Sequence, residues 1–200
     1  MPSRKPPAPI ATLVLPVGRH DHIQGSATAV VTLVEYGDCQ CPYCYDARPI
    51  IKELQRQFGD QLRYVFRHFP LVKMHAYAQR AAEATEAAGS QGKFWEMLDY
   101  LFDHQEGLDA AQVMRAATTL RLDKIKFSRE VAERVHLGRV EKDIQSGIHS
   151  GVSGTPALFI NGVRSDDADD LAALKAKIEE AILLVKPSGA KRARVAGRPS

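Results

Sequence analysis

Apolar residues along the chain recur with two different periods, and the changes between the periods mark the predicted elements. Val30 to Tyr36 is a run of β-branched and other apolar residues with the length of a buried strand. Strand propensity ends at Gly37, and Pro42 then opens an amphipathic pattern that continues to Phe58. Arg63 to Arg67 predicts a second strand. This strand, helix, strand order implies a parallel pair with a right-handed crossover.

Helical periodicity dominates the middle of the chain, from residue 75 to residue 150. Ala76 to Ala88 consists almost wholly of small residues, and Phe94 to Phe102 has a wide apolar face. Asp109 is the predicted N-cap of a third helix and Ser128 that of a fourth. We expect four helices here. The apolar face that begins at Phe94 is expected to be core rather than a cofactor site.

The strand pattern returns after residue 151. Ala157 to Ile160, followed by Asn161-Gly162 and then Val163-Arg164, predicts a β-hairpin, because Asn-Gly is the strongest short turn signal. Asp169 or Asp170 is the predicted N-cap of a final helix that ends before residue 187. Near the N-terminus, the loose alternation from Ile10 to Val17 predicts an edge strand.

These patterns divide the chain into five parts. Residues 1–9 and 187–200 are predicted to be disordered tails, and the second of them is basic. Residues 10–74 and 151–186 are predicted to form one α/β domain. Residues 75–150 are predicted to be an all-helical insertion within that domain.

Charge and composition exclude some classes of protein. The formal charge is +3 over 200 residues, but six Lys and Arg residues lie in the two tails, and the rest of the chain carries −3. We therefore expect no specific nucleic-acid partner. No apolar run approaches the roughly 18 residues that a membrane span needs. A signal peptide is not recognisable, and we expect a cytoplasmic protein.

Three cysteines lie within six residues, which is not the spacing of a disulfide framework. Three interpretations are open. Cys41 and Cys44 are a dithiol that cycles with its disulfide, or they form an inert structural disulfide, or they join Cys39 in a zinc site with His68 or His75 as fourth ligand.

Local geometry favours the dithiol. With Pro42 at the first helical position, Cys41 becomes the N-cap and Cys44 lies one turn inside the helix. The sulfur of Cys41 then faces unpaired backbone N–H groups and the positive end of the helix dipole, which favour thiolate over thiol. A second unit, Thr155-Pro156, precedes the predicted strand at Ala157, and base rates alone predict a trans bond there.

Four sequence segments, in this order, resemble those of the thioredoxin superfamily and, within it, of the DsbA-like thiol-disulfide oxidoreductases. They are VTLVEYGDCQCPYC, FRHFPL, QGKFWEM and GVSGTPALFING. The match extends from about Pro16 to Lys186. The resemblance implies an α/β, thioredoxin-like fold of βαβ…ββα order, with a mixed central sheet and an inserted all-helical subdomain. It also implies that Pro156 is a cis-proline beside the active-site sulfurs.

The resemblance implies roles for the site residues. An exposed Cys41 exchanges disulfides with substrate, and Cys44 resolves the mixed disulfide. Glu35 lies at the position of the family's buried acid, where it would pass protons to Cys44; a surface glutamate at a strand end is the alternative.

Four further residues are expected to contact the substrate or tune the site. Pro42 and Tyr43 lie between the sulfurs and are expected to tune the redox potential. Thr155 and Pro156 are expected to present backbone groups to an extended substrate.

Cys39 departs from the family pattern, which usually has an aromatic residue at this position. An accessory thiol two residues before Cys41 would form an alternative disulfide, accept glutathione or bind a metal. The alternative is a small buried apolar substitute.

The sequence therefore predicts an enzyme that exchanges a Cys41–Cys44 dithiol and disulfide with protein or low-molecular-weight thiols. The redox-active disulfide needs no cofactor, and glutathione is a candidate co-substrate. A glutathione-linked reductase or isomerase on the same scaffold, and a zinc-binding or redox-sensing module, are the alternatives.

Overall fold

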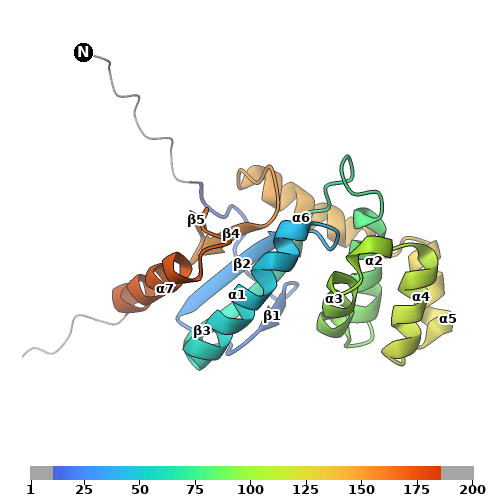
Figure 1. Ribbon diagram of the computed structural model, residues 1–200, viewed down its shortest axis with the longest axis horizontal. Helices are drawn as coiled ribbons and strands as arrows, with labels where there is room; N and C mark the ends of the chain where they lie inside the picture. The colour runs from blue at the N-terminus through green and yellow to red at the C-terminus, as the bar shows by residue number, and fades with distance from the viewer. Residues whose placement is uncertain (1–10, 186–200) are drawn as a thin grey trace, which may run out of the picture.

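A mixed five-stranded sheet forms the centre of the computed structural model, which describes residues 11–185 (Figure 1). The strands lie in the order β1-β3-β2-β4-β5, and only β2 and β3 are parallel. Their bounds are β1 His22–Gln24, β2 Val31–Gly37, β3 Leu62–His68, β4 Ala157–Ile160 and β5 Val163–Ser165. The predicted tails, residues 1–9 and 187–200, lie outside the described residues.

Two helices cover one face of this sheet. They are α1 (Pro42–Phe58), which crosses from β2 to the parallel β3, and α7 (Leu171–Val185), which follows the hairpin β4–β5 (Figure 1). The opposite face packs against α6 (Leu137–His149). No helix within residues 11–185 combines the length and the apolar character that crossing a membrane requires.

Successive side chains of β2 point to opposite faces of the sheet, so they pack against different helices. Val31 and Leu33 face the core under α1 and α7, whereas Val34 and Tyr36 face the core under α6. Glu35 continues the first of these two sets, so its carboxyl points toward α1. The sheet therefore places one acidic side chain inside an otherwise apolar layer.

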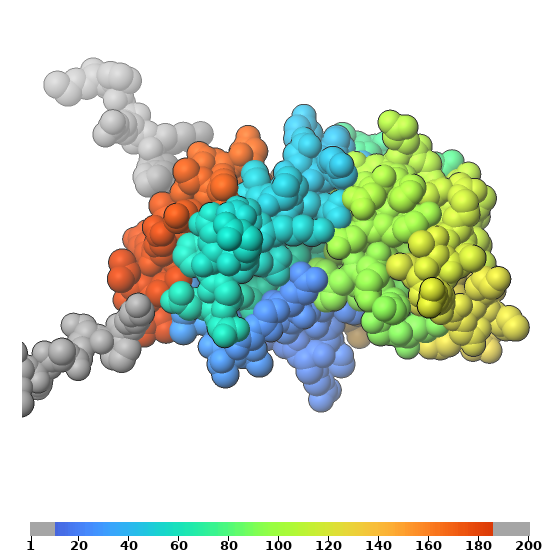
Figure 2. All heavy atoms as spheres, turned by 60° about the horizontal axis from the view of Figure 1, so that its bottom comes forward, coloured from blue at the N-terminus to red at the C-terminus, as the bar shows by residue number. Residues whose placement is uncertain are grey.

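The helical insertion lies between β3 and β4 and contains five α-helices rather than the four that we predicted. They are α2 (Ala78–Gly89), α3 (Phe94–Phe102), α4 (Ala110–Thr119), α5 (Lys124–Ala132) and α6, with a short 3-10 turn, η2 (Gln105–Gly107), between α3 and α4. In Figure 2 the helices α3 to α5 form a lobe that lies directly against α1.

The prediction that Ser128 caps the last helix of the insertion is wrong. Ser128 lies inside α5, and the N-cap of that helix is Asp123, whose carboxylate accepts the backbone N–H groups of Ile125 and Lys126. The last predicted helix of the insertion is in fact two helices, because Arg134, with a φ of 55°, breaks the backbone between α5 and α6.

The predicted edge strand from Ile10 to Val17 is also wrong for the part that is described. Residues 11–17 contribute one isolated bridge, between Thr12 and Val163, and pairing ends there because the backbone N–H of Val14 donates to Ser150 Oγ instead. The edge strand beside β3 is instead β1, in a segment for which no strand was predicted. Two of its three residues, His22 and Gln24, are polar and only partly buried, and Glu86 accepts a hydrogen bond from His22.

Other predictions are confirmed. Cys41 is the N-cap of α1 with Pro42 in its first turn, and Gly59 ends that helix with a positive φ. Asp109 caps α4, and Asp170 precedes α7, where its carboxylate accepts the N–H of Ala173. The apolar face of α3 lies in the core, as expected.

Candidate active site

The two cysteines of the C-P-Y-C segment lie at the start of α1, and both are free thiols. The N-cap Cys41 has extended backbone angles, with φ −73° and ψ 120°, and Cys44 lies one turn further on. Cys41 was expected to be exposed, but only 2% of its surface is accessible. The segment before β4 covers it, and Cys41 Sγ lies 3.3 Å from the carbonyl oxygen of Thr155, to which the protonated thiol donates.

The two sulfurs differ in acidity. The pKa of Cys41 falls from 9 to about 6, mainly because the Cys44 thiol donates a hydrogen bond to its sulfur; the Thr155 side chain and the backbone N–H groups of Cys44 and Tyr43 add to this, and burial opposes it. Burial raises the pKa of Cys44 well above 9. Cys41 is thus the thiolate at neutral pH, and Cys44 keeps its proton.

Glu35 lies under the cysteines, and the alternative of a surface glutamate is wrong. Only 1% of its surface is accessible. The hydroxyl of Tyr64, on β3, donates to Glu35 Oε2 at 2.5 Å, and Oε1 has no hydrogen-bond partner within the described residues. Burial raises the pKa of Glu35 from 4.5 to about 7, although Tyr64 and Cys44 both lower it by hydrogen bonding. A carboxyl with this pKa exchanges a proton readily near neutral pH.

The segment before β4 completes the site. The Thr155–Pro156 bond is cis, so the trans bond that base rates favour is not found here. β4 pairs antiparallel with β2, and this pairing brings Thr155 to Cys41 across 114 positions of sequence. The buried Thr155 hydroxyl makes no other hydrogen bond among the described residues, so it is available to the Cys41 thiolate, whose pKa it lowers.

Pro42 and Tyr43 occupy the exposed side of the C-P-Y-C segment, and Tyr43 is 71% accessible. Two more exposed apolar side chains, Val72 and Met74, lie on the loop that follows β3. The carboxylate of Asp38 fastens this loop to the active-site segment. Apolar surface is therefore available beside the sulfurs.

Asp38 makes this attachment through two hydrogen bonds. Its Oδ2 accepts the backbone N–H of Leu71 at 2.8 Å and lies 2.7 Å from His75 Nδ1. Sequence reasoning did not single out Asp38, although its place between strand and cysteines was a signal. Tyr64 had no such signal, because only the register of β2 with β3 brings it to Glu35.

The structure favours the plain interpretation of Cys39. The side chain is 2% accessible and lies in the apolar core with residues of α2. Its burial and the neighbouring Asp38 carboxylate raise its pKa far above 9, although the Thr85 hydroxyl opposes this. A buried protonated thiol is a poor acceptor for glutathione and a poor metal ligand.

The zinc site, which was one of the alternative interpretations of the three cysteines, is not formed in the described part of the chain. Within residues 11–185, no three His, Cys, Asp or Glu side chains are grouped so that they would hold a metal ion. His68 lies 3.2 Å from Glu86, and His75 pairs with Asp38 instead of approaching the sulfurs.

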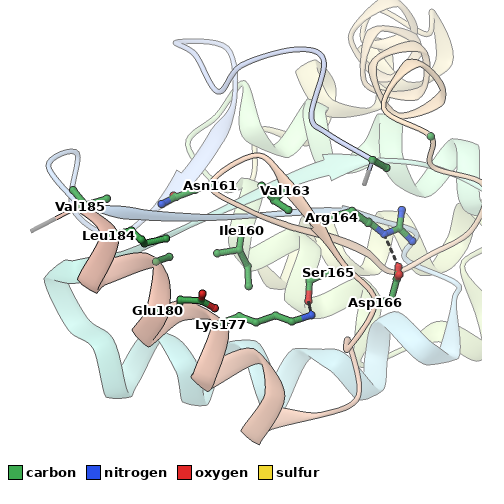
Figure 3. A pocket seen from close by; sticks show the side chains of 13 residues that line it. Ile160, Asn161, Val163, Arg164, Ser165, Asp166, Lys177, Glu180, Leu184 and Val185 are labelled. Atoms are coloured by element: carbon green, nitrogen blue, oxygen red, sulfur yellow. Dashed lines mark hydrogen bonds and ion pairs between the residues drawn. The ribbon is translucent and has the colours of Figure 1, made fainter. Parts of the chain in front are cut away.

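A pocket of about 810 Å³ lies elsewhere, between the hairpin β4–β5 and α7 (Figure 3). Ile160, Val163 and Leu184 contribute apolar lining, and Lys177 reaches Ser165 at 3.1 Å. None of the site residues named above lines this pocket. The chemistry of the sulfurs is therefore separate from it.

Comparison with known proteins gives a family and a fold. A family model described as thioredoxin matches residues 18–180. The chain is 44% identical over 173 residues to a protein of Salinispora tropica named Na(+)/H(+) antiporter NhaA 3, covering 86% of this chain and 26% of that protein. It is 43% identical over 180 residues to an antiporter NhaA 1 of Mycolicibacterium vanbaalenii, covering 87% and 29%. The chain spans between a quarter and a third of the length of these relatives.

Solved structures with the same fold include oxidised BdbD from Bacillus subtilis, with a TM-score of 0.76 and 22% identity over 82% of this chain and 94% of that one. Another is α-DsbA1 from Wolbachia pipientis, with a TM-score of 0.73 and 21% identity over 87% and 98%. The catalytic domain of Proteus mirabilis ScsC gives 0.71 and 21% over 82% and 90%. These likenesses confirm the predicted thioredoxin-like fold with its helical insertion.

Proposed function

The chain belongs to the thioredoxin family whose model matches residues 18–180, and on that premise we propose that it is a thiol-disulfide oxidoreductase. The observation that carries the proposal is the unequal pair of sulfurs at the start of α1. Cys41 has a pKa of about 6, whereas burial keeps Cys44 protonated. Cys41 can therefore attack a substrate disulfide or leave as a thiolate, and Cys44 can resolve the mixed disulfide that Cys41 forms.

In the oxidising direction, a substrate thiolate attacks Cys41 Sγ and breaks the Cys41–Cys44 bond. Cys44 leaves as a thiolate and takes a proton from Glu35. A second substrate thiol, once deprotonated, attacks the mixed disulfide, and Cys41 leaves as a thiolate. The substrate loses two electrons and the protein disulfide gains them. The low pKa of Cys41 favours this last step, since a more acidic thiol leaves faster.

The same residues serve the reverse reaction. The Cys41 thiolate attacks a substrate disulfide, and one substrate sulfur leaves as a thiolate. The Glu35 carboxylate accepts the proton of Cys44, which then attacks Cys41 Sγ, forms the Cys41–Cys44 disulfide and releases the second substrate sulfur as a thiolate. Direction then depends on the redox potential of the pair against that of its surroundings.

Protein and peptide thiols are the proposed substrates. The exposed apolar side chains of Tyr43, Val72 and Met74 suit an unfolded or extended chain, and the backbone at Thr155 and Pro156 lies beside Cys41 for pairing with it. Glutathione is proposed as a co-substrate on chemical grounds only.

Equilibration of the purified protein with defined ratios of reduced and oxidised glutathione tests the proposal. We expect reversible loss of two thiols per chain, abolished in Cys41→Ser and Cys44→Ser and retained in Cys39→Ala. Catalysis by Cys44→Ser at the wild-type rate would instead indicate a glutathione-linked monothiol mechanism. A potential well below that of the glutathione couple would exclude the oxidising direction.

A second candidate function is a redox module that acts on an ion transporter, because the two curated relatives named Na(+)/H(+) antiporters contain segments 44% and 43% identical to this chain. Cys44→Ser expressed in cells traps partners as mixed disulfides at Cys41. Recovery of a transporter among them, absent with Cys41→Ser, supports this candidate, and recovery of none refutes it. A cytoplasmic location stays a prediction, and labelling by a membrane-impermeant thiol reagent in intact cells tests it.

A further inference from the structure

One side chain of the helical insertion reaches the backbone of the active-site segment. Gln105, in the turn η2, donates from Nε2 to the carbonyl oxygen of Cys39 at 2.7 Å and to that of Cys41 at 3.0 Å. Both acceptors flank the reactive sulfur in sequence, and one belongs to the N-cap itself. Gln105 is half buried and has no other role in the site as described above.

A second attachment close by holds the end of α3, just before η2, against α1. Arg48, one turn beyond Cys44, donates to Asp99 at 2.5 Å and to Asp103 at 2.8 Å, and its guanidinium lies 4.9 Å from the ring centre of Phe102. These three partners lie at the C-terminal end of α3, two to six residues before Gln105. The Gln105 hydrogen bonds and the Arg48 contacts therefore fix η2 and the end of α3 beside α1. Gln105 thus has a defined position relative to Cys41.

We propose that Gln105 is a positioning residue through which the helical insertion sets the thiolate chemistry of Cys41. The proposal rests on the proposed function and adds a residue to it. The N-cap needs extended backbone angles so that the sulfur of Cys41 stays within reach of the N–H groups at the start of α1. In the disulfide, the bond to Cys44 constrains this geometry. In the dithiol that constraint is gone, and Gln105 holds both neighbouring carbonyl groups.

The two hydrogen bonds of Gln105 both stabilise the Cys41 thiolate. They fix the N-cap, and they direct the positive end of an amide group toward carbonyl oxygens that would otherwise repel the thiolate. Their loss therefore disfavours the thiolate and the reduced protein. We expect Gln105→Met, which keeps side-chain length but cannot donate, to raise the pKa of Cys41 by about 0.5, a roughly threefold change in the thiolate equilibrium.

Gln91 offers a matched control. It is half buried in the same insertion, and its Nε2 donates to the backbone carbonyl of Asp123 at 3.3 Å, while its Oε1 accepts the N–H of Asp123 at 2.8 Å. Gln91→Met removes comparable hydrogen bonds without touching the active-site segment. A general loss of stability should appear in both Gln91→Met and Gln105→Met, whereas a change in the pKa of Cys41 should appear only in Gln105→Met.

The experiment uses the full chain with Met and Ala at each of the two positions, so that one variant that fails to fold leaves another. Thiolate absorbance at 240 nm is followed against pH, and the dithiol fraction is measured against glutathione. Gln105 variants should show the raised pKa and a roughly threefold shift toward the disulfide, and Gln91 variants neither.

An unchanged titration in folded Gln105 variants, or an equal shift in Gln91 variants, overturns the proposal. Thiolate titration requires no turnover. A wild type that fails to exchange with glutathione would therefore refute the proposed function, while the titration still decides the role of Gln105.

Discussion

Replacing Glu35 by Gln should stabilise the protein at alkaline pH and have little effect on its stability at pH 5. The carboxyl is 1% accessible, and its pKa is about 7 in the folded protein against 4.5 in the absence of burial. A raised carboxyl pKa means that the folded state holds its proton more tightly than the unfolded chain does. The associated stability is present below pH 4.5 and is lost as the pH rises to about 7.

The magnitude follows from that difference in pKa. At about 1.4 kcal/mol for each pH unit, ionising Glu35 in its buried place costs roughly 3 kcal/mol, of which about 2.5 kcal/mol develops between pH 5 and pH 8. The amide side chain of Glu35→Gln keeps the shape of the carboxyl and cannot ionise, so the variant should not show this loss. The gain of the variant over wild type should therefore grow by about 2.5 kcal/mol across that range.

Urea unfolding of both proteins under reducing conditions, at half-unit steps of pH, measures the difference. The thiolate of Cys41 titrates in the same range, with the opposite effect on stability, because its pKa is lowered on folding. The comparison is therefore repeated in a Cys41→Ser background. A stability difference between wild type and Glu35→Gln that stays constant within about 0.5 kcal/mol from pH 5 to pH 8 would refute the reasoning.

Three further outcomes are expected. Absorbance at 240 nm should report thiolate formation with a midpoint near pH 6 that disappears in Cys41→Ser and is unchanged in Cys39→Ala; a midpoint near 9 would contradict the assignment. Cys44→Ser should accumulate a long-lived mixed disulfide at Cys41, detected by mass, and rapid release would show that another group resolves it. Tyr64→Phe should raise the pKa of Glu35 further, because the tyrosine hydroxyl donates to its carboxylate; carboxyl infrared absorption measures this, and an unchanged value contradicts it.

Local sequence signals predicted the parts of the fold whose cause is local. Pro42 and Gly59 mark the two ends of α1 because one lacks an N–H and the other tolerates a positive φ, and the Asn161-Gly162 turn joins β4 to β5. The break between α5 and α6 was missed because Arg134, with its positive φ, is not a residue type that marks a turn. Likewise β1 is too polar and short to be recognised without its neighbour β3.

The active site likewise has features that local sequence determines and features that depend on tertiary contacts. Most of the acidity of Cys41 was predictable, because the Cys44 thiol and the backbone N–H groups of Cys44 and Tyr43 lie within three residues of it. Its burial was not, since that depends on a segment 114 positions away. Tyr64 and Gln105 were missed for a related reason: each reaches the site through tertiary packing, one across the β2–β3 pair and the other from the insertion.

The contact between Cys41 and Thr155 also determines at which stage of synthesis and folding the active site can form. During synthesis both cysteines emerge well before β4, which must pair with β2 before Thr155 can cover the sulfur. A nascent chain or fragment that ends before residue 155 lacks the donor hydroxyl and the cover over Cys41. The selective reactivity of this pair is therefore a property of the finished sheet, and a shortened chain would carry cysteines open to indiscriminate oxidation.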